Sequence, residues 1–126
     1  MKRMWLALAL ISATVIISFS CLFILTNFKN EFDKEFDTLY EMTINGDIEN
    51  AVEYSKYVTE KWLDEHHAIC QIVRHTQMDQ VTLAVSRLES LALYEESGEL
   101  AAEIMRCKIL LDEIWESELP TLKNIF

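Results

Sequence analysis

The chain divides into one long apolar run near its amino terminus and a remainder in which apolar and charged residues recur with helical spacing. Residues 5–26 carry no charged side chain, and every acidic residue follows them. About twenty apolar residues in a helix span the roughly 30 Å of hydrocarbon in a bilayer. We therefore predict a transmembrane anchor at residues 5–26. The run is longer than the apolar segment of a signal peptide, so we expect the anchor to be retained.

The charges that flank this run predict its orientation. Lys2 and Arg3 precede it without any acidic residue, whereas Lys29 and Lys34 follow it among several acidic side chains. Basic residues favour the cytoplasmic side of a membrane. We expect residues 1–4 in the cytoplasm and the rest outside, as a single-pass protein of the cell membrane.

After the anchor, apolar residues at intervals of three and four predict four amphipathic helices. The helices are separated at residues 45–47, near residues 75–76 and at residues 97–99. At the second break, Thr76 with Asp79 resembles a capping box. The fourth helix is expected to end before Pro120. This gives an extracytoplasmic helical domain at residues 27–117 and a carboxy-terminal tail at residues 118–126.

Two glycine turns suggest that the helices form two hairpins. Aligning Gly46 with Gly98, 52 residues apart, also aligns Asp47 with Glu99. Two amphipathic hairpins can also resemble one another by convergence. Since two repeats are too few for a stable solenoid, we favour a bundle over a solenoid-like pair. The predicted fold is all-α, with one transmembrane helix followed by an antiparallel bundle of about four helices.

Composition narrows the possible functions of this domain. The chain holds 21 acidic and 11 basic residues and has a net charge of −10, which disfavours nucleic acid as a partner. It contains only 2 glycines and 1 proline, and no glycine-rich phosphate loop or nucleophile elbow. We expect no enzymatic activity and no cofactor.

A polar cluster in the second predicted helix has two interpretations. His66, His67 and Cys70 have side chains that can hold zinc or another transition metal, although no second helix offers a matching pair. The alternative is a surface run of polar residues, in which histidines near a helix end favour the helix dipole. We predict no metal site and keep these three residues as weak candidates.

Two further pairs of residues each allow two interpretations. His75 and Asp79 are four residues apart at the second break, so they form either a proton-sensing pair or a contact that joins the two hairpins. Cys70 and Cys107 lie on diagonal helices of the predicted bundle, too far apart for a disulfide, and we expect free thiols.

Small residues in the anchor suggest a contact face. Ala9, Ala13 and Ser20 lie on one narrow stripe of the predicted transmembrane helix. Small residues let two helices approach closely, although such patterns also arise by chance. The expected partners of this stripe are another membrane protein or a second copy of the chain.

The layout of the chain resembles a bacterial family of small, single-pass proteins, the family of domain of unknown function 4363. The resemblance covers nearly the whole chain and rests on the short anchor and on scattered residues, namely Trp62, Arg74-His75 with Asp79, Ser86-Arg87-Leu88 and Lys123-Asn124-Ile125-Phe126. Similar proteins more often have an acidic residue just before an isoleucine-aspartate step, and Gln77-Met78-Asp79 departs from that pattern here. The resemblance implies a membrane-anchored helical protein and supplies no activity.

These observations lead to two hypotheses about function. The first is a non-enzymatic accessory or interaction subunit, anchored in the cell membrane. The second is an extracytoplasmic sensor or a module that binds a ligand or metal. Because the sequence shows no second span and no cytoplasmic output domain, such a sensor would have to signal through a partner.

Overall fold

The computed structural model describes residues 1–71 and 73–125, and the side chains of this range up to residue 117. Its elements are four helices, α1 (Lys2–Ile44), α2 (Ile48–Cys70), α3 (His75–Leu93) and α4 (Ser97–Ile125). No strand occurs in the described ranges. The predicted all-α fold is therefore confirmed.

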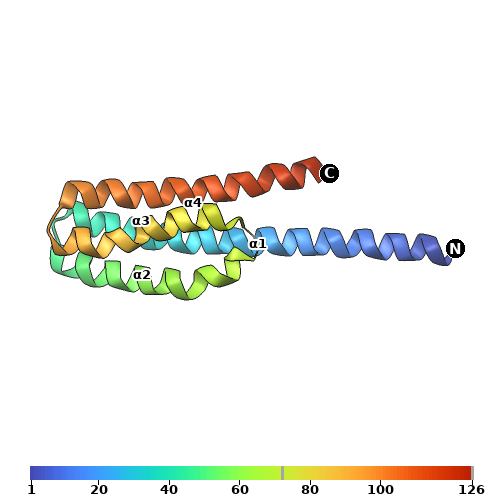
Figure 1. The fold of residues 1–126 in the computed structure, drawn as a ribbon, viewed down its shortest axis with the longest axis horizontal. Coiled ribbons are helices and arrows are strands. Elements are labelled where there is room, and N and C mark those ends of the chain that lie inside the picture. Colours follow the sequence, from blue (N-terminus) through green and yellow to red (C-terminus); the bar gives the residue numbers. More distant parts are fainter. Residues whose placement is uncertain (72, 126) are drawn as a thin grey trace.

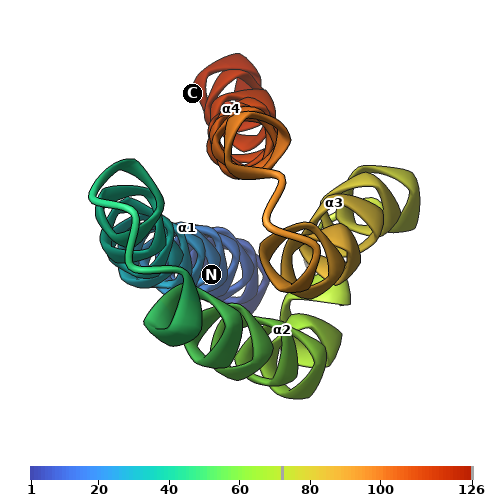
Figure 2. The same ribbon diagram turned by 90° about the vertical axis from the view of Figure 1, so that its left-hand side faces the viewer.

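The four helices lie lengthwise beside one another, and the chain reverses direction at each of the three turns (Figure 1). α1 packs against α2 and α4, and α3 packs against the same two helices. Figure 2 shows this arrangement along the helix axes. The amino-terminal part of α1 extends beyond the turn between α2 and α3 and farther than the end of α4 (Figure 1).

Large apolar side chains from all four helices fill the space between them. Trp62 of α2 is fully buried, and its ring centroid lies 5.3 Å from that of Phe28 and 5.2 Å from that of Phe32. Its indole N–H donates a 2.8 Å hydrogen bond to the hydroxyl of Thr82 on α3. The aromatic side chains of α1 and α2 therefore form one end of the core.

The turn between α1 and α2 is built as predicted around a glycine. Gly46 has φ of +76°, a left-handed conformation that glycine adopts without steric cost. The N–H of Gly46 donates to the carbonyl of Thr43, and that of Asp47 donates to the carbonyl of Met42. These two bonds form a Schellman motif, which satisfies the last carbonyls of α1.

The turn between α3 and α4 repeats this motif without using its glycine. Glu95 has φ of +58° and donates to the carbonyl of Ala92, while Glu96 donates to the carbonyl of Leu91. Gly46 therefore corresponds to Glu95, 49 residues later, and the predicted 52-residue register is wrong. Gly98 instead lies in the first turn of α4, where it has no left-handed φ.

The buried positions of the two hairpins follow the same corrected register. Each of eight buried residues in the first hairpin corresponds to a buried residue 49 positions later in the second. The first set comprises Phe32, Phe36, Leu39, Thr43, Ala51, Ser55, Val58 and Trp62, and the second comprises Val81, Val85, Leu88, Ala92, Leu100, Ile104, Cys107 and Leu111. The repeat is thus one of packing geometry rather than of residue identity.

The break predicted at residues 97–99 lies inside α4, since the turn occupies residues 94–96, and two further predicted boundaries differ from the structure. The N-cap of α3 is Arg74, which makes no side-chain capping bond, so the capping box proposed for Thr76 and Asp79 is wrong. Thr76 already lies inside the helix, where its side chain cannot take the N-cap position. At the other end, α4 continues to Ile125 instead of ending before Pro120. The fixed φ of proline fits a helix, at the loss of one backbone hydrogen bond.

α1 combines a free apolar half with a half that belongs to the core. Among the described residues, it is the one helix long and apolar enough to cross a membrane. Only 6% of its most apolar stretch is buried within the protein. Farther along, Phe28, Phe32 and Phe36 of the same helix are buried in the core.

Candidate functional site

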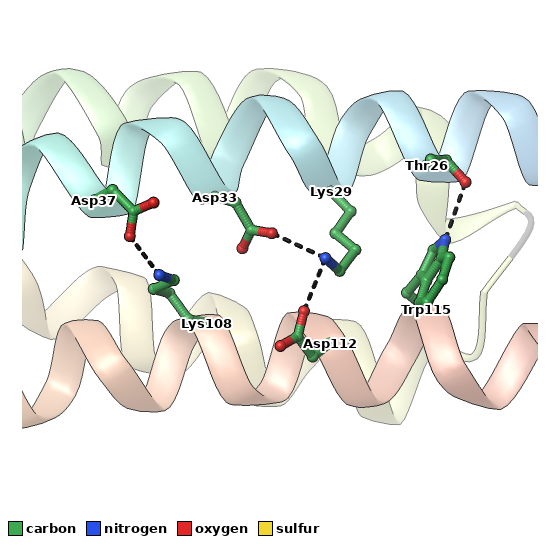
Figure 3. A network of polar contacts seen from close by, with 7 residues as sticks. All are labelled: Thr26, Lys29, Asp33, Asp37, Lys108, Asp112 and Trp115. Carbon is green, nitrogen blue, oxygen red and sulfur yellow. Dashed lines mark hydrogen bonds and ion pairs between the residues drawn. The ribbon is translucent and has the colours of Figure 1, made fainter.

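A row of polar contacts, the α1–α4 ladder, joins α1 to α4 just beyond the apolar run (Figure 3). Its members are Thr26, Lys29, Asp33, Asp37, Lys108, Asp112 and Trp115. The indole of Trp115 donates a 3.0 Å hydrogen bond to Thr26, and Lys108 pairs with Asp37. These contacts hold the start of the buried half of α1 against α4.

Lys29 lies at the centre of the ladder. Its ammonium group is 2.9 Å from a carboxylate oxygen of Asp33 on its own helix and 2.9 Å from one of Asp112 on α4. Burial alone would lower the pKa of Lys29, but the hydrogen bonds with Asp112 and Asp33 outweigh it and raise the pKa. The lysine therefore stays charged and links the two helices.

A second charged cluster joins α1 to α2. The ammonium group of Lys61 lies 2.5 Å from Glu31 and 3.3 Å from Glu35, and Tyr54 donates a hydrogen bond to Glu35. Burial would lower the pKa of Lys61, but its two glutamate partners raise it. Burial and then the bond to Glu35 raise the pKa of Tyr54 to about 12. Both groups keep their protons at neutral pH.

Nearer the apolar run, residues of α1 and α2 line an open groove of about 500 Å³, which we call the proximal groove. Its apolar part is formed by Phe23, Ile24, Phe28, Ala68 and Ile69, and its polar part by Asn27, Glu31, Asp64 and Glu65. Burial, followed by the negative charge of Glu31, raises the pKa of Glu65, despite the opposing charge of Lys61. The groove thus combines an apolar floor with crowded carboxylates.

The predicted small-residue stripe lies in line with this groove. Ala9, Ala13 and Ser20 are exposed on the free half of α1. At about 100° per residue, these three and the groove residues Asn27 and Glu31 point within about 40° of one another around the helix. The stripe and the proximal groove therefore form one continuous face of α1.

The candidate metal ligands at the end of α2 have other contacts. Nδ1 of His66 lies 2.9 Å from the carbonyl oxygen of Leu63, so it carries the proton and donates. The ring of His66 stacks on that of Trp62, and the ring centroid of His67 lies 4.2 Å from that of His66. Within residues 1–71 and 73–125, no group of three or more His, Cys, Asp or Glu side chains is placed to hold a metal ion.

The structure does not join His75 to Asp79. Both are exposed, and in the described part of the chain no hydrogen bond or ion pair connects them. Asp79 instead acts on Cys70 of α2, whose pKa is raised first by burial and then by this negative charge. Asp79 is thus placed beside the last turn of α2.

The cysteines are free thiols in different surroundings. Cys70 is half-buried, and Cys107 is buried in the core. Burial is the main cause that raises the pKa of Cys107 to about 12. This thiol is unreactive at neutral pH, since the thiolate is the nucleophile.

Sequence reasoning missed the residues that join the helices. The spacing of Lys29 and Asp33 signals an ion pair within one helix. No comparable signal points to the contact of Lys61 with Glu35 or of Trp115 with Thr26, because these depend on how helices pack.

Comparison with known proteins gives one finding. Neither the curated proteins nor the solved structures contain a match to this chain. A family model described as a domain of unknown function, DUF4363, matches residues 19–125, which include the buried half of α1 and all of the other three helices. The match covers most of the 126 residues, so the chain belongs to the DUF4363 family.

Proposed function

We propose that this protein is a non-enzymatic accessory subunit of another membrane protein, held by a single transmembrane helix at residues 5–26. In this proposal its four helices form an antiparallel bundle outside the cell membrane, and its amino terminus lies in the cytoplasm. The observation that carries the proposal is the continuity of α1, which passes without a break from a free apolar half into the core.

The contacts of α1 support this role. The apolar half of α1 has little contact with the rest of the protein, so its surface is available to lipid and to other helices. Its buried half is tied to α4 by the α1–α4 ladder and to α2 by Lys61. An accessory subunit needs such a rigid connection, because a contact made in the membrane then fixes the position of the external domain.

The orientation is tested by reporter fusions to the carboxy terminus. An alkaline phosphatase fusion is expected to be active and a fluorescent protein fusion dark, because the first folds only outside the cytoplasm and the second only inside. The reverse pattern would overturn the proposed topology.

The partner contact is tested by the native mass of the protein after mild detergent extraction from its own membranes. We expect a complex larger than the monomer. The double variant Ala9→Leu with Ala13→Leu should dissociate it, because larger side chains prevent close approach of a helix. Ala7→Leu, also exposed but on the opposite side of α1, is the matched control. A monomer from native membranes would refute the proposed role.

A further inference from the structure

Two carboxylates of the proximal groove, those of Asp64 and Glu65, have no ion-pair partner among the described residues. A third, that of Glu31, pairs with Lys61. Elsewhere α1 meets its neighbours through paired charges, such as Lys29 with Asp112. The groove is therefore a place where α1 and α2 present an apolar floor and a surplus of negative charge.

The position of the groove restricts what can occupy it. Phe23 and Ile24 belong both to the groove and to the end of the apolar run. If residues 5–26 span the cell membrane, the groove opens at the outer face of that membrane. The small-residue stripe continues from it into the bilayer on the same face of α1. An occupant that follows this face has an apolar part in the membrane and a polar part just outside it.

Charge excludes several other occupants. A second copy would bring its own Glu31, Asp64 and Glu65 to the same level and meet like charges. Anionic lipid headgroups are repelled for the same reason. A metal ion lacks a site, because the described residues contain no group of three or more ligands placed to hold one. What remains is a helix that carries positive charge where it leaves the membrane.

We propose that the stripe of Ala9, Ala13 and Ser20 and the proximal groove together bind the transmembrane helix of a different membrane protein. This partner helix carries Lys or Arg just beyond the outer face of the cell membrane. This inference rests on the proposed function and specifies the partner's chemistry. The partner's apolar segment packs on the small residues, and its basic residue lies between Asp64 and Glu65. Burial and then the negative charge of Glu31 raise the pKa of Glu65, and such a cation would offset the second of these causes.

The test uses the full chain in nanodiscs of neutral phosphatidylcholine, with an acceptor dye at its amino terminus. The probe is a synthetic helix of roughly 20 Leu and Ala residues with a donor dye. One version has two lysines at each end and the other has two glutamines, so the direction of insertion does not matter. Energy transfer measures their association with the chain.

We expect the lysine probe to bind about fivefold more tightly than the glutamine probe, as for one partly exposed ion pair. The variant Asp64→Asn with Glu65→Gln should abolish this difference, and high salt should reduce it. The matched control Glu113→Gln with Glu116→Gln removes two exposed acidic side chains from α4 and should keep the difference. The stripe variant Ala9→Leu with Ala13→Leu should weaken both probes.

Equal binding of the two probes, no binding of either, or an equal effect of the groove and control variants would overturn the inference. A second overturning result is energy transfer between differently labelled copies that is lost in Asp64→Asn with Glu65→Gln, because a second copy would then occupy the groove. The proposed function is judged separately by the native complex and its stripe variant. If the native complex persists but the lysine and glutamine probes bind equally, the inference about the groove is refuted and the proposed function is not.

Discussion

Replacing Gly46 and Gly98 by alanine, one at a time, should change stability in opposite directions. Each glycine marks a hairpin turn in the sequence, and a Cβ at either position meets no atom within 4 Å, so steric contact does not distinguish them. The backbone does. Gly46 has φ of +76°, whereas Gly98 is the second residue of α4.

The magnitudes follow from these conformations. An L-residue in the left-handed region costs about 1–2 kcal/mol, so Gly46→Ala should lower the free energy of unfolding by about that amount. Alanine is favoured over glycine in a helix by up to about 1 kcal/mol, and an early helical position realises part of it. Gly98→Ala should therefore raise the free energy of unfolding by about 0.5 kcal/mol. Glu95→Gly should also stabilise, by about 1 kcal/mol, because Glu95 occupies the left-handed position.

The assay is urea unfolding of the full chain in detergent micelles, followed by the helical circular dichroism signal. Wild type and the three variants are compared at one pH and one detergent concentration. Destabilisation by both alanine variants, or a larger loss for Gly98→Ala than for Gly46→Ala, would refute the equivalence of Gly46 with Glu95.

Three further predictions use the same assay. Trp62→Ala should cost about 3–5 kcal/mol by opening a cavity in the core, whereas Trp5→Ala, which changes an exposed side chain outside it, should cost nothing; a loss below about 1 kcal/mol at Trp62 would contradict the packing. Lys61→Met should cost about 1–3 kcal/mol at pH 7 by leaving two glutamates unpaired, whereas Lys61→Arg, which keeps the positive charge, should cost less; equal losses would contradict the charge argument. Since burial raises the pKa of Cys107 from 9.0 to about 12, the unfolded state loses this proton first, so stability should fall as pH rises from 9 to 12, and less steeply in Cys107→Ala. An unchanged slope in that variant would exclude the thiol as a cause.

The helices and their order could be predicted from the spacing of apolar residues, because one buried face per helix leaves a clear period. Phe28, Phe32 and Phe36 show this period and are all buried. The register of the repeat could not be predicted, because Glu95 takes a conformation that sequence reasoning assigns to glycine. The backbone hydrogen bonds of the turn determine which residue takes the left-handed conformation, and these bonds do not require a particular side chain.

The candidate site was only partly predictable, for a related reason. Ala9, Ala13 and Ser20 are recognisable as a stripe because they lie on one helix. Asp64 and Glu65 appear in the sequence only as part of a polar cluster next to two histidines. Their place in a groove with Phe23 depends on how α2 packs against α1, and no local pattern records that contact.

If residues 5–26 span the membrane as proposed, the unbroken course of α1 makes the position of the outer turns depend on bilayer thickness. The helix has 43 residues and is about 65 Å long at 1.5 Å per residue. A transmembrane helix adjusts to a thinner bilayer by tilting, commonly by about 20°. Since α1 has no hinge at the membrane surface, such a tilt carries the roughly 27 Å from residue 27 to Ile44 with it and displaces Gly46 sideways by about 9 Å. Lipid composition would thus decide how far from the partner's axis the two outermost turns are held.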